Sequence, residues 1–205
     1  MDAIFLDIDG TLWDSTYIVS DAWNTVLEKK PEINLVITPK LLKTLFGRPL
    51  PEIASVIFAD YPKETQIELI DECCEKEHEF LELNPGIIFE GVVETIKELA
   101  QKYPVCIVSN CEAGYIELVM DKLGIQDCIT DFECPGYSGL GKGDNIKLVM
   151  ERNNYKDIVY VGDTQGDYEA TRKAAVPFVF CKYGFGKPEG YEYAVEKFSD
   201  LLTLF

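Results

Sequence analysis

Residues 3–12 read AIFLDIDGTL, and this stretch decides how the rest of the chain is organised. Apolar residues fill its first positions, with β-branched and aromatic side chains prominent, and carboxylates follow at Asp7 and Asp9. The pattern predicts a strand that is buried on both faces and ends in a charged tip. Side chains alternate along a strand, so we expect Asp7 and Asp9 to project to the same side, and Gly10 allows a sharp turn. Like charges buried at a strand end need a cation or a proton to offset them, which indicates a divalent metal site, acid–base chemistry or both.

Composition and charge exclude several classes of protein. The chain of 205 residues is long enough for one large domain or for a core with a smaller lobe. Its net charge of −17 argues against nucleic acid, anionic lipid or another polyanion as the main partner, and suits a protein that binds Mg²⁺. Seven cysteines without a CxxC pair, and a single histidine, argue against a zinc site and fit reduced thiols. No apolar run approaches the length of a membrane span and no basic leader precedes the first strand, so we expect a soluble, cytoplasmic protein.

Helical patterns follow the first strand without a convincing strand among them. We expect a helix capped by Ser20 or Asp21 that ends before Pro31, and further helices at about 39–46, 51–58 and 63–83. The next buried strand is expected only at 105–108. A strand–helix–strand unit takes about thirty residues, so the intervening chain is far longer than one crossover needs. We therefore predict an inserted α-helical cap at residues 13–83 and a core domain of residues 1–12 and 84–205.

Strands and helices alternate regularly in the rest of the chain. We expect helices at about 91–102, 112–123, up to Asn153 and at 166–175, strands at 128–132, 158–161 and 178–181, and a glycine-rich loop at 135–143. This alternation predicts an α/β fold with a doubly wound parallel sheet, in which ligands bind beyond the carboxyl ends of the strands.

Ser109 and Asn110 lie at one of these strand ends. They follow a strand and precede a helix, where a hydroxyl and free backbone amides can hold an anion such as phosphate. The same residue types also cap helices without any ligand, and both interpretations are open.

Residues 162–167, GDTQGD, repeat the arrangement of a strand followed by acids. The spacing of four places Asp167 one helical turn from Asp163. Two acids at a helix start can simply complement the helix dipole. With Asp7 and Asp9 converging from a neighbouring strand, a Mg²⁺ site is the better account, because hard cations prefer oxygen ligands.

Lys142 is a candidate active-site cation. The glycines around it let the backbone come close to a ligand. Residues 136–143 also nearly match the phosphate loop of nucleotide hydrolases, GxxxxGK[ST]. That match fails at its last position, because Gly143 has no hydroxyl to coordinate Mg²⁺.

In this order the motifs resemble those of the haloacid dehalogenase superfamily of phosphatases and phosphomutases. DIDGTL at 7–12 is similar to its first motif, Ser109 to its second, Lys142 to its third and GDTQGD at 162–167 to its fourth. The helical insertion after the first motif resembles the α-helical cap class, which includes phosphoglycolate phosphatases and β-phosphoglucomutase. The resemblance covers essentially the whole chain and implies a Rossmann-like core with a cap.

The resemblance also implies roles for the motif residues. Asp7 would be the nucleophile that forms an aspartyl-phosphate, and Asp9 the general acid and base. Lys142 would be a catalytic cation. The implied Mg²⁺ site consists of Asp7, Asp9 through its backbone carbonyl, Asp163, and Asp167 in support. The implied phosphate-binding residues are Thr11, Ser109, Asn110 and Lys142.

The predicted cap offers one further candidate. Arg48, in a turn-like FGRP segment at 46–49, is a candidate for binding a substrate carboxylate or second phosphate, and an exposed loop arginine is at least as good an account. We expect His78 to be a surface residue, and Cys111 to be a packed thiol with oxidation sensitivity as the alternative.

The function predicted from these features is Mg²⁺-dependent hydrolysis of a small phosphate monoester, as in phosphoglycolate phosphatases. The expected partner is a small phosphorylated metabolite, with no nucleic acid or membrane, and the expected state is a monomer or small homo-oligomer. A sugar phosphomutase is the alternative within enzymes. A phosphoacceptor signalling module is the non-enzymatic alternative, although such receivers are shorter and lack a cap.

Overall fold

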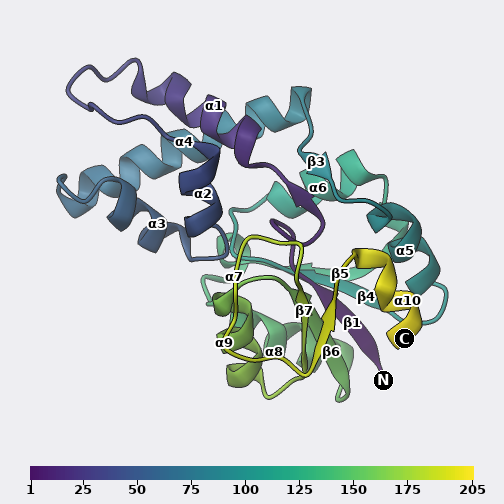
Figure 1. Cartoon of the computed structure of the whole chain (residues 1–205). Helices are drawn as coiled ribbons and strands as arrows, with labels where there is room; N and C mark the ends of the chain where they lie inside the picture. The colour runs from purple at the N-terminus through teal and green to yellow at the C-terminus, as the bar shows by residue number, and fades with distance from the viewer.

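Six parallel strands form the central sheet of the computed structural model, which describes residues 1–205 (Figure 1). The strand order is β5-β4-β1-β6-β7-β8, so β1 (Ala3–Leu6) lies inside the sheet. It pairs with β4 (Val105–Val108) on one side and with β6 (Ile158–Gly162) on the other. The outer strands are β5 (Ile129–Glu133), β7 (Phe178–Cys181) and β8 (Tyr193–Val195). The predicted parallel α/β sheet is therefore confirmed.

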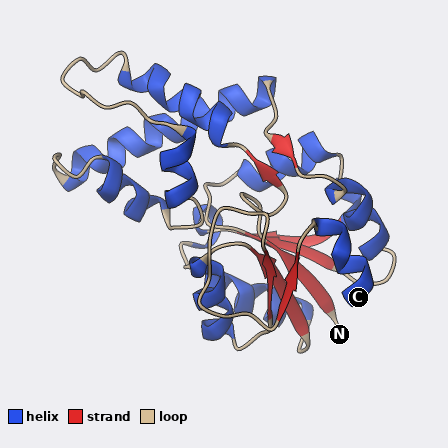
Figure 2. Ribbon diagram, viewed as in Figure 1, coloured by secondary structure: helices blue, strands red, loops and turns tan.

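Both faces of the sheet are covered by helices, as Figure 2 shows. Alternate residues of β1 face opposite sides: Ile4 and Leu6 join the larger apolar cluster, and Ala3 and Phe5 the smaller one. The helices over the larger cluster are α5 (Val92–Leu99), α6 (Tyr115–Leu123) and α10 (Leu201–Leu204). Those over the smaller cluster are α8 (Lys142–Asn153) and α9 (Gln165–Ala174). The sheet is doubly wound, as the sequence predicts.

Four of the five helices between β1 and β4 form a separate group beside the sheet, which we call the helical lobe (Figure 1). They are α1 (Thr16–Leu27), α2 (Pro39–Leu45), α3 (Leu50–Ile57) and α4 (Lys63–Leu83). Helix α1 starts earlier than expected, because the Asp14 carboxylate accepts the Thr16 backbone N–H at 3.0 Å. None of the helices is long and apolar enough to cross a membrane. The division of the chain at residues 13–83 stays a prediction.

A short antiparallel pair connects the helical lobe to the rest of the chain. β2 (Trp13–Asp14) pairs with β3 (Ile87–Ile88), so the chain leaves and returns at one place. No strand lies among the four lobe helices, as expected, and β2 and β3 lie on either side of them. The sequence did not indicate β2 and β3, since a strand of two residues is too short to show alternation. The sequence also did not indicate β8 and α10.

The predicted glycine-rich loop at 135–143 contains helical structure. α7 (Pro135–Ser138) occupies its first part, and α8 begins at Lys142 with Gly141 as the N-cap. The remaining helical turns are short 3₁₀ segments at Gln126–Cys128 and Phe198–Asp200. Lys142 therefore lies at a helix N-terminus and not in an open loop.

Candidate active site

The candidate residues come together because their strands are neighbours. Asp7 follows β1, Ser109 follows β4 and Asp163 follows β6, and these three strands are adjacent and parallel. The carboxyl ends of parallel strands meet at one edge of the sheet, which is where ligands bind in such folds.

Three buried carboxylates form the centre of the site. Asp7, Asp163 and Asp167 each offer one oxygen, and these oxygens lie within 4.8 Å of one another. All three side chains are at most 1% exposed. Burial, followed by the charge of Asp167, raises the pKa of Asp7 to about 6, and the same two causes raise the pKa of Asp163 well above its usual range.

Lys142 is the only cation in contact with this cluster. Its Nζ lies 2.9 Å from Asp7 Oδ1 and 2.6 Å from Asp167 Oδ1, and the side chain is 3% exposed. Burial lowers the lysine pKa, but the charges of Asp167 and Asp7 outweigh it and leave a net rise. One lysine does not neutralise three carboxylates, so a divalent cation fits the remaining charge, and oxygen ligands are those that Mg²⁺ takes.

The backbone holds Asp163 and Asp167 in place. Asp167 Oδ2 accepts the backbone N–H groups of Asp163 at 3.2 Å and Thr164 at 2.9 Å, in a capping box at the start of α9. The Phe185 N–H donates to Asp163 Oδ2 at 2.6 Å. Gly10 has φ +83°, and a Cβ there would lie 2.2 Å from Asp163 Oδ2, so only glycine fits beside this carboxylate.

Thr11 contacts the carboxylate cluster and not the cavity. Its hydroxyl donates to Asp163 Oδ1 at 3.3 Å, and the residue is completely buried. The residues that line the cavities of the site do not include Thr11. The structure therefore places it where it orients Asp163.

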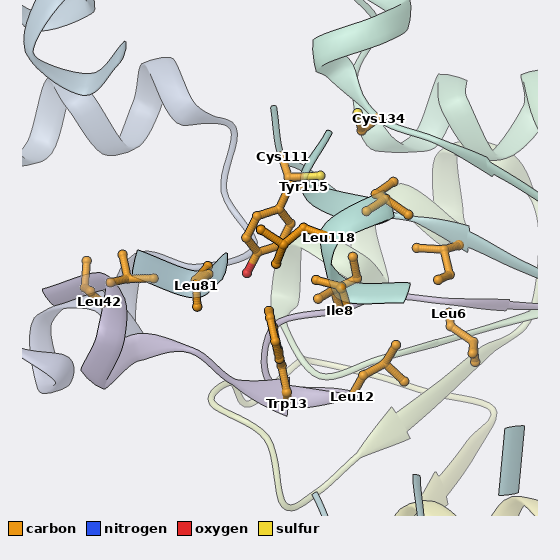
Figure 3. Close-up of a cluster of buried hydrophobic side chains, with 14 of the residues drawn as sticks. Leu6, Ile8, Leu12, Trp13, Leu42, Leu81, Cys111, Tyr115, Leu118 and Cys134 are labelled. Carbon is orange, nitrogen blue, oxygen red and sulfur yellow. The ribbon is translucent and has the colours of Figure 1, made fainter. Parts of the chain in front are cut away.

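The Asp9 carboxylate points away from the three-carboxylate cluster. It accepts hydrogen bonds from Ser15 Oγ at 2.6 Å, Trp13 Nε1 at 3.1 Å and the Tyr115 hydroxyl at 2.9 Å. Figure 3 shows Tyr115 and Trp13 next to each other, and their rings meet edge to face. Burial is the main cause that raises the pKa of Asp9 to about 7, so near neutrality this group can hold or release a proton.

Ser109 and Asn110 lie between the carboxylates and the helical lobe. The Ser109 hydroxyl interacts with the Asp7 carboxyl. Asn110 Nδ2 donates to the Gly47 carbonyl at 2.8 Å, whereas Asn110 Oδ1 is buried without a partner. Gly47 has φ +88°, and a Cβ there would lie 2.8 Å from Thr164 Oγ1, so the α2–α3 turn rests directly on the core.

A cavity of about 50 Å³ lies between the core and the helical lobe. Asp7, Asp9 and Ser109 line its inner end, and Arg48 contributes from the α2–α3 turn. The Arg48 side chain makes no hydrogen bond or ion pair and also borders a wider pocket of about 590 Å³ that reaches Lys142. The structure thus brings Arg48 to the same cavity as Asp7 and Asp9.

This cavity is also lined by two residues that the sequence analysis did not place in the site. His78, expected at the surface, is half-buried there, because α4 turns the face with Cys74, Glu77 and His78 toward the core. Cys111 also lines the cavity, and burial raises the pKa of its thiol well above the usual range, as for a packed thiol.

A family model described as haloacid dehalogenase-like hydrolase matches residues 4–181. The chain belongs to this family. No curated protein matches the chain.

Several solved structures have the same fold as this haloacid dehalogenase-like hydrolase. A family hydrolase from Streptococcus pneumoniae is 20% identical with a TM-score of 0.85, covering 100% of this chain and 98% of its own. A predicted phosphoglycolate phosphatase from Haemophilus somnus is 20% identical with a TM-score of 0.82, covering 100% and 97%. CbbY from Rhodobacter sphaeroides, in complex with xylulose-1,5-bisphosphate, is 13% identical with a TM-score of 0.82, covering 98% and 96%. At these identities the likeness shows the fold alone.

Sequence reasoning missed four residues that contact Asp9 or present a carboxylate to the cavity of this hydrolase. They are Trp13, Ser15, Glu77 and Tyr115. Trp13 and Ser15 follow Asp9 closely, so a turn that folds back on the carboxylate was a detectable signal. Tyr115 and Glu77 reach the site only through tertiary packing, and nothing in the sequence marks them.

Proposed function

We propose that the protein is a Mg²⁺-dependent phosphatase that hydrolyses a small phosphate monoester through an aspartyl-phosphate on Asp7. The observation that carries this proposal is the position of Asp7, which lies in the buried carboxylate cluster, contacts Lys142 and also lines the cavity. A nucleophile must touch both the charge-stabilising groups and the space where substrate binds, and Asp7 does so.

The carboxylates fit a bound Mg²⁺ ion. Asp7, Asp163 and the Asp9 backbone carbonyl would hold it, with Asp167 in support. The ion would neutralise the charge of the phosphoryl group as the substrate binds. Without a cation, burial and then the charge of Asp167 hold the pKa values of Asp7 and Asp163 high, and a divalent ion would relieve this repulsion between carboxylates.

Asp7 and Asp9 divide the chemistry between them. An Asp7 oxygen attacks phosphorus and the bond to the leaving oxygen breaks, which leaves the phosphoryl group on Asp7. Asp9, protonated near neutrality, gives its proton to the leaving oxygen. Asp9 then takes a proton from the water that attacks phosphorus, phosphate departs, and both carboxyl groups return to their starting states.

Lys142, Ser109 and Asn110 bind the phosphoryl oxygens in this proposal. The lysine charge, the serine hydroxyl and the asparagine backbone amide would stabilise the negative charge that is shared among these oxygens in the transition state. Ser109 lines the smaller cavity, Lys142 the wider pocket, and Asn110 lines both.

The partner proposed for this site is a small phosphorylated metabolite, since a cavity of about 50 Å³ admits only a small leaving group. The net charge of −17 supports the absence of nucleic acid and membrane partners. We further propose that the protein acts in the cytoplasm as a monomer or small homo-oligomer.

The decisive experiment measures phosphate release from a panel of small phosphate monoesters, with Mg²⁺ and with EDTA. We expect Mg²⁺-dependent release from at least one compound and its loss in Asp7→Asn. Asp127→Asn, a change of the same kind at an exposed position, serves as the matched control and should retain activity. A stable phosphoprotein without phosphate release would point to a signalling module, and transfer to a sugar to a phosphomutase; either result would overturn the proposal.

A further inference from the structure

The side of the cavity opposite Asp7 is where the leaving group of the substrate would bind. Asp7 and Ser109 mark the end where phosphorus would bind, and α1 and α4 supply Trp23, Glu77 and His78 on the opposite side. The volume of about 50 Å³ holds only a few water-sized groups, so the leaving group contacts these side chains directly. The inference below rests on the proposed function and names the class of leaving group.

Glu77 presents a free oxygen to this space. Its Oε2 accepts the Trp23 Nε1 hydrogen at 2.9 Å, and Trp23 is 1% exposed, so the carboxyl group is held by a fixed donor. Oε1 has no hydrogen-bond partner, and no cation forms an ion pair with Glu77. Burial, followed by the charge of Asp9, raises the pKa of Glu77 to about 8. A ligand with a positive charge would stabilise its carboxylate form.

Aromatic side chains surround the same space. Trp23, Phe46 and Tyr115 all line the cavity with Glu77. The face of an aromatic ring attracts a cation, and a carboxylate among aromatic rings is a common way to bind an ammonium group. A neutral hydroxyl group could donate a hydrogen bond to the carboxylate, but the rings would not attract it as they attract a cation.

The approach to the cavity is acidic as well. A neighbouring pocket of about 430 Å³ shares Cys74, His78 and Glu112 with the cavity and adds Asp71 and Glu75. The charge of Asp71 contributes to the raised pKa of Glu112, after burial. Arg48 is the one arginine or lysine on the cavity wall, and it lies on the α2–α3 turn. The field along this approach favours a cationic group over a carboxylate.

We propose that Glu77 determines substrate specificity and selects phosphate monoesters whose leaving group carries an ammonium group. The ammonium N–H donates to Glu77 Oε1 and lies against the rings, while Asp7 attacks phosphorus at the other end of the cavity. Two or three atoms between the nitrogen and the ester oxygen fit this volume, as in a short aminoalkyl phosphate.

The test compares kcat/KM for three small esters that differ in one group: 2-aminoethyl phosphate, ethyl phosphate and phosphoglycolate. In the wild type we expect 2-aminoethyl phosphate to exceed ethyl phosphate by about tenfold or more, and phosphoglycolate to be the poorest. Glu77→Gln should reduce the ratio of 2-aminoethyl to ethyl phosphate by at least about fivefold, mostly through KM. Glu68→Gln is the matched control, because Glu68 is exposed on α4 and makes no hydrogen bond or ion pair.

Two outcomes would overturn this inference while leaving the phosphatase intact. One is a kcat/KM for phosphoglycolate that equals or exceeds that for 2-aminoethyl phosphate, which would show that Arg48 binds the leaving group. The other is a ratio that Glu77→Gln leaves unchanged. If neither these three esters nor any other ester of the panel of small phosphate monoesters releases phosphate in an Asp7-dependent way, the proposed function itself fails, and the two failures are thereby distinguished.

Discussion

The Tyr115 hydroxyl lies 2.9 and 3.0 Å from the two carboxylate oxygens of Asp9, although 106 positions separate the residues. The contact joins the start of α6 to the turn after β1, and Ser15 and Trp13 approach the same carboxylate from the connection to the helical lobe. The proposed general acid is thus oriented by both parts of the molecule, and its protonation depends on these three donors.

Tyr115→Phe removes one of these donors. Hydrogen bonds to the carboxylate lower the pKa of Asp9, so the variant should raise that pKa above its present value of about 7. Because Asp9 must be protonated to act as the acid, the alkaline limb of the kcat/KM profile should shift to higher pH, with kcat lower by about tenfold. A pH–rate series measures both, and Tyr193→Phe, at an exposed position, is the control. An unshifted alkaline limb would contradict the role of Tyr115.

The stability of the metal-free protein should fall as pH rises from about 4 to about 8. The folded state raises the pKa of Asp9 to about 7 and that of Glu77 to about 8, so folding takes up protons across this range. Each group contributes at most about 1.4 kcal/mol per pH unit between its unfolded and folded pKa values. Urea denaturation in EDTA measures the slope. Glu77→Gln should flatten it, whereas Glu68→Gln should not, and an equal slope in both variants would refute the assignment.

Mg²⁺ should stabilise the protein through the carboxylate cluster. At a hundredfold excess over Kd a ligand adds about 2.7 kcal/mol of stability, which thermal unfolding detects as a higher Tm. Asp163→Asn should abolish most of this gain without destabilising the metal-free protein, because it also removes repulsion within the cluster. Asp127→Asn should respond to Mg²⁺ as the wild type does. The same Tm gain in Asp163→Asn would place the ion elsewhere.

Lys142→Met should destabilise the metal-free protein by about 3–5 kcal/mol at pH 8, because it leaves the buried Asp7 and Asp167 without a counter-charge. The loss should be smaller at pH 5, where Asp7, with a pKa of about 6, is protonated. Phosphate release should be lost at both pH 8 and pH 5. Lys147→Met, exposed on the same helix, tests for a general effect of removing a lysine, and a pH-independent loss of stability would contradict the argument.

Long, regular patterns carried most of the fold prediction. The apolar runs of β1, β4, β6 and β7 and the amphipathic lobe helices each have enough residues to show their period. β2 and β3 have two residues each, and their pairing depends on where the lobe begins and ends, so sequence periodicity does not reveal them.

The candidate site was predictable to the extent that it depends on topology. Asp7, Ser109 and Asp163 had to meet because they follow parallel neighbouring strands, and Asp167 is tied to Asp163 by one helical turn. The direction of individual side chains was not predictable. Thr11 turns to Asp163, Asp9 turns to Tyr115, and Glu77 reaches the cavity, and each orientation depends on packing between segments far apart in the chain.

Trp13 pairs with Ile88 and Asp14 with Ile87. The polypeptide therefore leaves the core and returns to it at this one antiparallel pair, which is the seam between the core and the helical lobe. Everything beyond that seam can in principle be exchanged for a different insertion without breaking a hydrogen bond of the central sheet. A graft would have to retain Trp13 and Ser15, the two donors to Asp9 beside the seam. We expect that hybrids joined at the β2–β3 pair keep the carboxylate cluster of the core unchanged. Their substrate range should become that of the protein that donates the lobe.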